Sequence, residues 1–160
     1  MSSEPDAGAV PAFTHLDARG RARMVDVTAK PLTHRVAVAK CSIVTSTDMA
    51  ELLRDGEVVG AARIAGMQAA TLTSSLIPLC HPIRIDRVTV DFGVVPRGVE
   101  ISAVTEVVER TGVEMEALSA CAVAGLTLLA AVIGVDPGAS IEQLTLWHKS
   151  GGRSGDWQRS

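Results

Sequence analysis

Aromatic residues are scarce in this sequence: its 160 residues include two Phe, two Trp and no Tyr. Proteins that bind single-stranded nucleic acid stack bases on aromatic rings, so this composition argues against that class of function. The core must therefore consist mainly of Val, Ile, Leu and Ala, within a hydrophobic content of 47%. A chain of this size and content suits one compact domain, and its Ala-rich segments favour close helix packing or a subunit interface.

Paired cysteines are also absent. Cys41, Cys80 and Cys121 lie far apart, with no C-x-x-C spacing. An odd number of widely spaced cysteines fits neither a disulfide framework nor a structural zinc cluster. We therefore expect a reducing compartment, the cytoplasm. Residues 1–13 have no basic region followed by an apolar stretch, so we interpret them as a disordered leader and not as a signal peptide.

An excess of positive charge is missing too. The formal net charge is −3, which argues against a surface that coats nucleic acid phosphates. The most apolar run, residues 117–135, is interrupted by serine, threonine and two glycines and follows two glutamates. A buried helix explains this run better than a membrane span does.

The hydrophobic periodicity predicts seven elements. The first helix has Ser46 or Thr47 as its N-cap and Gly56 as its stop, and the second ends before Pro78. Two strands separated by Pro-Arg-Gly predict an antiparallel hairpin. The predicted strands are 34–45, 85–95, 99–110 and 140–148, and the predicted helices are 46–56, 58–76 and 110–134.

The order strand, helix, helix, strand, strand, helix, strand predicts an α+β fold. Its simplest form is ferredoxin-like, with an antiparallel sheet of about four strands and the helices packed on one face. We expect a single domain over residues 14–160, with a flexible C-terminal tail from about residue 149.

The segment "LIPLCHPIRI" places Cys80 and His81 between Pro78 and Pro82. Neighbouring residues point apart, and no second pair has ligand spacing, so we expect neither a metal site nor a catalytic dyad. The commoner interpretation is a buried cysteine beside a half-exposed histidine. The alternative is a rigid turn that holds one imidazole where it can donate to a phosphate or transfer a proton.

The segment "RTGVEME" contains two glutamates with different expected roles. Glu114 follows Thr111 by three residues, which is the spacing of a helix capping box. Glu116 lies on another side of the helix and leads into an apolar face, so it either pairs with an arginine or is reserved for a ligand. The available arginine partners are Arg35, Arg63 and Arg110.

Two further segments carry positive charge. Lys149 and Arg153 lie in "HKSGGRSGD", and Lys30, His34 and Arg35 precede the first strand. Such Gly-Ser-rich segments are usually solvated, but they can also wrap an anion. In a chain of negative net charge, these local cations together suggest a pocket for a polyanionic small molecule.

Five blocks, "RMVDVTAKP", "ARIAGMQAA", "LIPLCHPI", "RTGVEMEAL" and "KSGGRSGD", resemble the MoaC family in order and spacing. The resemblance runs from about Thr14 to Asp156. It implies a cyclic pyranopterin monophosphate synthase, a lyase of molybdenum cofactor biosynthesis, which converts a cyclic dihydro-GTP intermediate and releases pyrophosphate. It also implies a hexamer built as a trimer of dimers, with active sites at dimer interfaces. No resident cofactor or metal is expected, although Mg²⁺ could accompany the triphosphate.

By the same resemblance, Lys149, His81 and Glu116 are the expected catalytic residues. The residues expected to contact the substrate are Leu79, Cys80, His81, Glu114, Met115, Glu116, Arg35, Lys30, Arg63 and Arg153. If the far end of the long helix also serves catalysis, Ala130 lies about 21 Å from Glu116 at helical rise, too far for one small pocket. Two chains sharing a site would resolve this.

The sequence departs from the family pattern at several positions. The family's catalytic Asp and Lys positions hold Ala130 and Ile133, a further Lys position holds Asp55, and a Lys-Arg pair is replaced by Thr71-Leu72. Loss of an acid/base group commonly costs 10²- to 10⁴-fold in rate, so we expect weak or no activity from the isolated chain. Two hypotheses follow: a synthase that keeps slow chemistry, or an impaired paralogue that binds the intermediate or assembles with a complete homologue.

Overall fold

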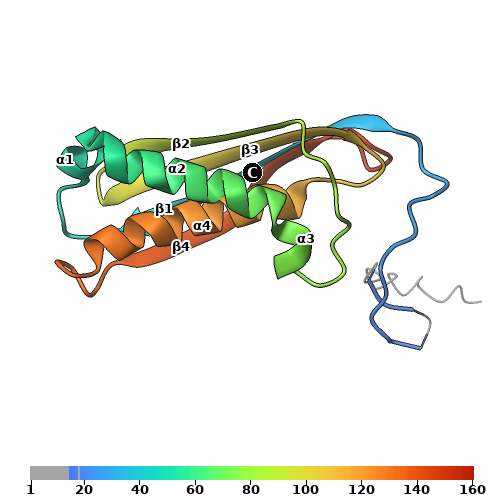
Figure 1. The fold of residues 1–160 in the computed structure, drawn as a ribbon, viewed down its shortest axis with the longest axis horizontal. Coiled ribbons are helices and arrows are strands. Elements are labelled where there is room, and N and C mark those ends of the chain that lie inside the picture. Colours follow the sequence, from blue (N-terminus) through green and yellow to red (C-terminus); the bar gives the residue numbers. More distant parts are fainter. Residues whose placement is uncertain (1–14, 18) are drawn as a thin grey trace, which may run out of the picture.

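The computed structural model describes residues 15–17 and 19–160, so the leader predicted for residues 1–13 lies outside the described residues. The predicted order of elements is confirmed, with two short additions, α3 and β5 (Figure 1). The elements are β1 (Thr33–Val44), α1 (Met49–Arg54), α2 (Gly56–Thr71), α3 (Thr73–Leu76), β2 (Arg87–Val95), β3 (Gly98–Glu109), α4 (Glu114–Val132), β4 (Ser140–Ser150) and β5 (Trp157–Gln158).

The strands form one antiparallel sheet in the order β2-β3-β1-β4-β5. Helices α2 and α4 lie side by side across one face of it, as Figure 1 shows. This arrangement confirms the predicted α+β, ferredoxin-like fold, with one strand more than expected. The extra strand, β5, pairs with the end of β4.

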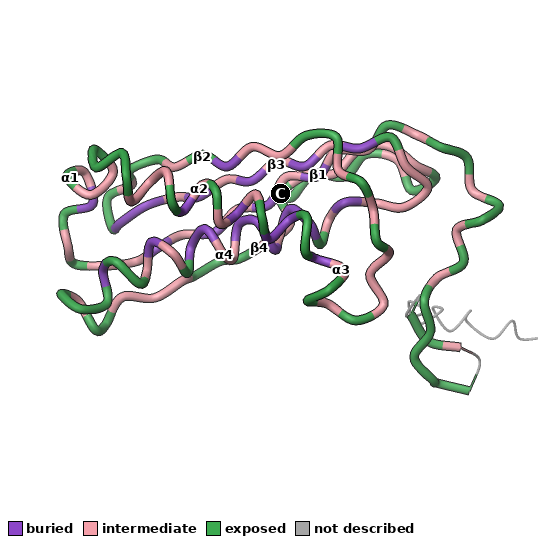
Figure 2. The backbone as a smooth tube through the Cα atoms, viewed as in Figure 1, coloured by how far each residue is buried: buried purple, intermediate pink, exposed green. Residues whose placement is uncertain are grey.

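The core lies between the sheet and α4, and Figure 2 shows the buried stretches of these elements. Most of the side chains here are small, which allows close approach. From Ala37 to Ile43, every second residue of β1 is buried, as the alternating sequence predicted. The buried residues of β1 and α4 that form this layer include Ala37, Ala39, Cys41, Ile43, Ala117, Ala120, Ala124 and Leu128.

Helix α4 is long and apolar enough to cross a membrane by length and composition alone. In the structure it packs against α2 on one side and against β1, β3 and β4 on another. The apolar run is therefore the core helix of a folded domain, as its interrupting polar and glycine residues predicted.

Several predicted helix ends were wrong. The N-cap of α1 is Asp48, whose carboxylate accepts a hydrogen bond from the Ala50 amide at 2.9 Å, and not Ser46 or Thr47. Gly56 does not end a helix, because Asp55 both closes α1 and caps α2 through the Glu57 amide at 3.0 Å. An aspartate can do both because its backbone amide faces the preceding helix while its side chain faces the next.

The C-terminal residues join the sheet in the structure. Lys149 and Ser150, where the sequence suggested the start of a tail, complete β4. Trp157 then pairs with Lys149 in the β4–β5 ladder. Lys149 is therefore held on a strand that lies directly beside β1.

Candidate active site

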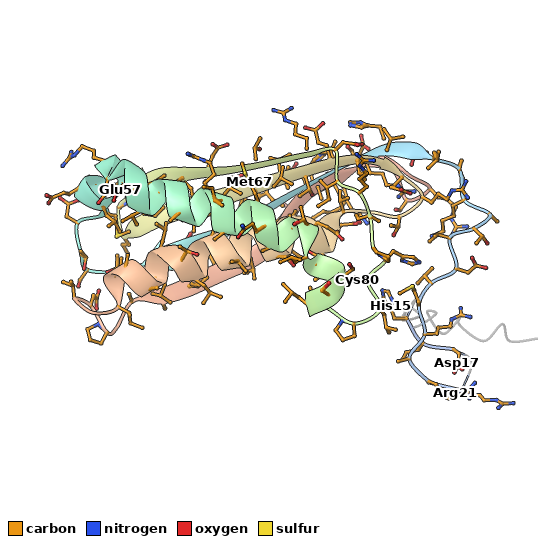
Figure 3. The ribbon with its side chains drawn as sticks, viewed as in Figure 1. His15, Asp17, Arg21, Glu57, Met67 and Cys80 are labelled. Carbon is orange, nitrogen blue, oxygen red and sulfur yellow. The ribbon has the colours of Figure 1, made fainter. Side chains whose placement is uncertain are left out.

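A cavity of about 130 Å³ lies beside the start of α4 and collects most of the predicted site residues. Three chain segments line it: the N-terminal segment, the turn after α3, and the loop that leads into α4. Figure 3 shows two of these segments meeting, with His15 beside Cys80. The lining residues are His15, Leu79, Cys80, His81, Thr111, Gly112, Glu114, Met115 and Glu116.

The turn that carries Cys80 and His81 is held in an unusual backbone conformation. Leu79 has a φ of +67°, in the left-handed region that side chains other than glycine rarely adopt. Such a residue costs about 1–2 kcal/mol, so its surroundings must hold it there. The Cys80 amide donates to the Ile77 carbonyl at 3.4 Å, which closes the turn. The proline-braced turn predicted from the sequence is therefore present, and it directs Cys80 and His81 to the cavity.

The predicted capping box at the start of α4 was wrong. Val113 is the N-cap and provides no side-chain cap, while Glu114 is the first helical residue. Glu114 instead accepts a hydrogen bond from Lys149, with Oε1 and Nζ 3.2 Å apart. Its carboxylate also lies directly over Gly112, where a Cβ would overlap it. Glu114 thus lines the cavity with its charge paired to Lys149.

Glu116 is the most informative residue of the site. The residue is 4% exposed, and within residues 15–17 and 19–160 no other residue makes an ion pair or hydrogen bond to its carboxylate. Burial raises the pKa of Glu116 to about 7; a hydrogen bond from its own backbone amide opposes this rise, and the nearby charge of Glu114 adds to it. Burial and the neighbouring Glu116 also raise the pKa of the Cys80 thiol.

The three arginines that could have paired with Glu116 are engaged elsewhere. Arg110 donates to the Thr28 carbonyl at 2.8 Å, and Arg63 donates to the Val90 carbonyl at 2.9 Å. Arg35 donates to the carbonyls of residues 109 and 110 at 3.0 and 3.1 Å. Of the two roles considered for Glu116, the structure therefore favours a group reserved for a ligand, because buried carboxylates otherwise find partners.

A second cavity, of about 420 Å³, carries positive charge. Lys30, Arg35 and Arg153 line it, together with Ala29, Pro31, Thr33 and Gly152. Gly152 packs directly against the Arg35 guanidinium, where a side chain would not fit. Three of the five cations predicted to meet a polyanion thus surround one space. The other two, His34 and Lys149, lie 3.4 Å from Glu106 and 3.2 Å from Glu114.

The two cavities are neighbours. Arg35 lines the cationic cavity and also holds the carbonyls of residues 109 and 110, immediately before Thr111 and Gly112 in the first cavity. Lys149 pairs in the sheet with Ala37, whose side chain is buried under the helices, and reaches Glu114. The arrangement places two acids, two imidazoles and several cations at one end of the helix layer.

Some predicted site residues lie elsewhere. Arg63, on α2, lines neither cavity, and its guanidinium lies over the Phe92 ring at 5.6 Å from the centroid. Ala130 and Ile133 lie at the opposite end of α4, and both are exposed. Asp55 caps α2 at that same end, whereas Thr71 and Leu72 lie where α2 gives way to α3, also exposed.

His15 is a cavity residue that the sequence did not indicate. It lies in an N-terminal segment in which no site residue was predicted. The signal that could have found it is the Asp-x-x-Gly turn at residues 17–20, which predicts a local reversal of the chain. In the described part of the chain, no group of three or more His, Cys, Asp or Glu residues is placed to hold a metal ion.

Comparison with known proteins identifies close relatives. The MoaC family model matches residues 24–152. A cyclic pyranopterin monophosphate synthase of Thermomicrobium roseum is 49% identical over 92% of this chain and 93% of its own length. The protein of the same name from Novosphingobium aromaticivorans is 47% identical, with 91% and 96% covered. Cyclic pyranopterin monophosphate synthase 2 of Mycobacterium tuberculosis is 47% identical, with 92% and 91% covered.

Proposed function

The chain belongs to the MoaC family, and from this we infer that it is a cyclic pyranopterin monophosphate synthase of molybdenum cofactor biosynthesis. We propose that its substrate is the cyclic dihydro-GTP intermediate, which it converts to cyclic pyranopterin monophosphate with release of pyrophosphate. The observation that carries this proposal is the unpaired, buried Glu116 beside His81, in a cavity that adjoins a cationic one.

The two cavities suit the two parts of such a substrate. The cavity of about 130 Å³ is too small for a whole nucleotide, since pockets that enclose drug-sized ligands measure roughly 300–1,000 Å³. It fits the reacting portion, while the triphosphate extends into the cationic cavity. There Lys30, Arg35 and Arg153 provide the cations and hydrogen-bond donors that phosphate oxygens require.

The side chains also suit the chemistry. Release of pyrophosphate with closure of a cyclic phosphate requires that an attacking hydroxyl lose its proton and that the leaving group's negative charge be stabilised. Glu116, with a pKa of about 7, can accept or donate a proton near neutral pH. His81 lines the same cavity and can donate a hydrogen bond to a phosphate oxygen. Lys149 holds Glu114 in place and adds positive charge.

We propose that the complete site is shared between two subunits of a cytoplasmic homohexamer. Glu116 and Ala130 lie on the same helix about 21 Å apart, so one chain cannot bring both ends of α4 to one small cavity. A second copy whose far end covers the cavity would complete it. The proposed site uses no resident metal, although Mg²⁺ could arrive with the triphosphate.

The residues at the end of the helix layer opposite the cavity favour a second function. Ala130 and Ile133 have no group that can transfer a proton, and Asp55 is engaged as a helix cap. A chain of this kind could bind the intermediate without converting it, or assemble with a complete homologue that supplies the missing groups. In this second function the chain retains the binding pocket and the assembly but does not convert the intermediate.

The deciding experiment supplies purified intermediate and follows product after conversion to a fluorescent derivative. The native chain is compared with an Ala130→Asp/Ile133→Lys variant. We expect slow or no turnover from the native chain and a gain of at least tenfold in the variant. Val135→Lys, which adds the charge of the Ile133→Lys change at a neighbouring exposed position, is the control for that charge and should leave the rate unchanged.

Brisk turnover by the native chain, with no gain in the variant, would show that the chemistry does not need groups at positions 130 and 133. Tight binding of the intermediate without turnover in the native chain would support the binding paralogue. Absence of both binding and turnover would contradict both functions.

A further inference from the structure

His15 reaches the candidate site from a part of the chain remote in sequence from the other lining residues. It lines the cavity with Cys80, His81 and Glu116, and Figure 3 shows it beside Cys80. Two imidazoles therefore face one small cavity, although only His81 was expected there.

A built turn holds His15 in this position. The His15 carbonyl accepts a hydrogen bond from the Arg23 amide at 2.8 Å, and the Asp17 amide donates to the Arg21 carbonyl at 2.9 Å. Leu16 and Ala22 form an antiparallel bridge between these two bonds. Residues 15–17 and 19–23 thus form a small hairpin, and His15 lies at its open end.

Asp17 stabilises this hairpin from within. Its carboxylate accepts hydrogen bonds from the amides of Arg19 and Arg21 at 2.9 Å and from the Arg21 guanidinium at 2.9 Å. These bonds, led by the Arg21 amide, lower the pKa of Asp17. Gly20 has a φ of +72°, which the tight reversal requires and glycine adopts without strain.

The side-chain pairings around the cavity leave the His15 imidazole available to a ligand. Glu114 is committed to Lys149 at 3.2 Å. Within the described residues, by contrast, the His15 imidazole makes no hydrogen bond, and its residue is exposed. An uncommitted imidazole at a cavity mouth can donate an N–H to an oxygen of whatever occupies the cavity.

We propose that His15 is a substrate-contacting residue, positioned at the cavity by the hairpin of residues 15–17 and 19–23. This inference rests on the proposed function for the identity of the ligand. The imidazole donates a hydrogen bond to an oxygen of the bound intermediate. Through His15, the hairpin forms part of the cavity wall.

Cys80 provides a direct reporter of this contact. Of the three cysteines, Cys41 and Cys121 are 1% and 0% exposed, whereas Cys80 is partly exposed and lines the cavity. Its alkylation by iodoacetamide can be followed by mass spectrometry, with and without purified intermediate. In the native chain we expect the intermediate to slow alkylation of Cys80 at least tenfold.

The variants separate contact from packing. His15→Ala should require about tenfold more intermediate for the same protection of Cys80, and should raise KM similarly if turnover is measurable. His15→Gln keeps a donor and should restore protection to within about threefold of native. Asp17→Asn, which weakens the hairpin and leaves the imidazole, should fall between them. Arg19→Ala, on the same turn but not lining the cavity, is the matched control and should behave as native.

Protection that is equal in the native, His15→Ala and His15→Gln chains would overturn the role of His15 and leave the proposed function standing. Equal loss of protection in the Ala and Gln variants would also overturn it, because a merely structural wall would respond in that way. Absence of protection in the native chain, with no turnover, would overturn the proposed function and the His15 contact together.

Discussion

A single buried carboxyl group carries most of the evidence for the site. Glu116 lies in the first turn of α4, and the residues that follow it enter the core, so its side chain points inward by geometry. A buried carboxylate without a partner from another residue costs several kcal/mol unless it takes up a proton, which is why its pKa rises to about 7. Such a residue weakens the fold and is retained where it serves a ligand.

This cost predicts a pH dependence. Because the pKa of Glu116 is raised from 4.5 to about 7, the folded chain binds more protons than the unfolded chain between these values. The free energy of unfolding therefore falls as pH rises through this window. Glu116→Gln removes the titration and should be more stable than native by on the order of 2–3 kcal/mol at pH 8, but about equal at pH 4.5.

Urea denaturation of both proteins at pH 4.5, 6 and 8 measures this difference. A constant difference across the three values would contradict a perturbed Glu116. The Glu116→Gln chain should also lose turnover, or the ability to bind the intermediate, despite its greater stability.

The burial of Glu116 was predictable, because helical geometry turned it toward the apolar face and no capping role explained it; its role toward a ligand stays a prediction. The capping role predicted for Glu114 was wrong. Thr111 and Glu114 have capping-box spacing, but in the folded chain Glu114 accepts a hydrogen bond from Lys149. The helix also begins at Glu114 itself, so this residue cannot be its N3 position. Lys149 is 35 positions away, and no local pattern reveals such a partner. The bond from Arg63 to the Val90 carbonyl, 27 positions away, is hidden from local sequence for the same reason.

At the scale of elements, the contact between α2 and α4 depends on Gly66, which has no side chain. A Cβ at Gly66 would lie 2.8 Å from the Ala120 carbonyl and 3.2 Å from the Cβ of Ala124. These distances are shorter than ordinary contacts, so α2 can approach α4 only with glycine at this position. The abundance of alanine in the sequence predicted tight helix packing, and the structure confirms it here.

Gly66→Ala should therefore destabilise the protein by about 1–3 kcal/mol, because α2 must move away from α4. Gly60→Ala is the matched control in the same helix, since a Cβ there meets no atom within 4 Å. It should stabilise the protein by up to about 1 kcal/mol through helix propensity. Thermal and urea unfolding of both variants measure the two effects, and equal shifts of the same sign would contradict this account of the helix contact.

The types and order of the elements were predictable because the hydrophobic period of each segment was long and regular. Their ends were not. Asp48 and Asp55 replaced the expected caps, and the predicted second helix is interrupted at Leu72, which separates α2 from α3. Several polar residues near a helix end can act as a cap, and tertiary packing decides among them.

At the scale of the whole molecule, the chain has two chemically different ends. One end of the helix layer holds the cavity with His15, His81 and Glu116, and the other holds Asp55, Ala130 and Ile133. If two copies share a site, each copy contributes its cavity end to one site and its opposite end to another.

This sharing predicts complementation between chains. A Glu116→Gln/Ala130→Asp/Ile133→Lys variant has a restored far end and a disabled cavity, whereas the native chain has the reverse. Co-expressed with different affinity tags and purified as mixed oligomers, the two should turn over the intermediate at least fivefold faster than either alone. Native chain mixed with Glu116→Gln is the control and should show no gain, because no restored end is present. A rate equal to the average of the separate proteins would contradict a shared site.

Asp55 has a structural role that the lysine expected from the family pattern could not fill. Its backbone amide closes α1 and its carboxylate caps α2. A lysine at this position would remove the cap, at about 1 kcal/mol, and would place a positive charge at the unfavourable end of the helix dipole. With a lysine at position 55, the start of α2 would thus need another cap.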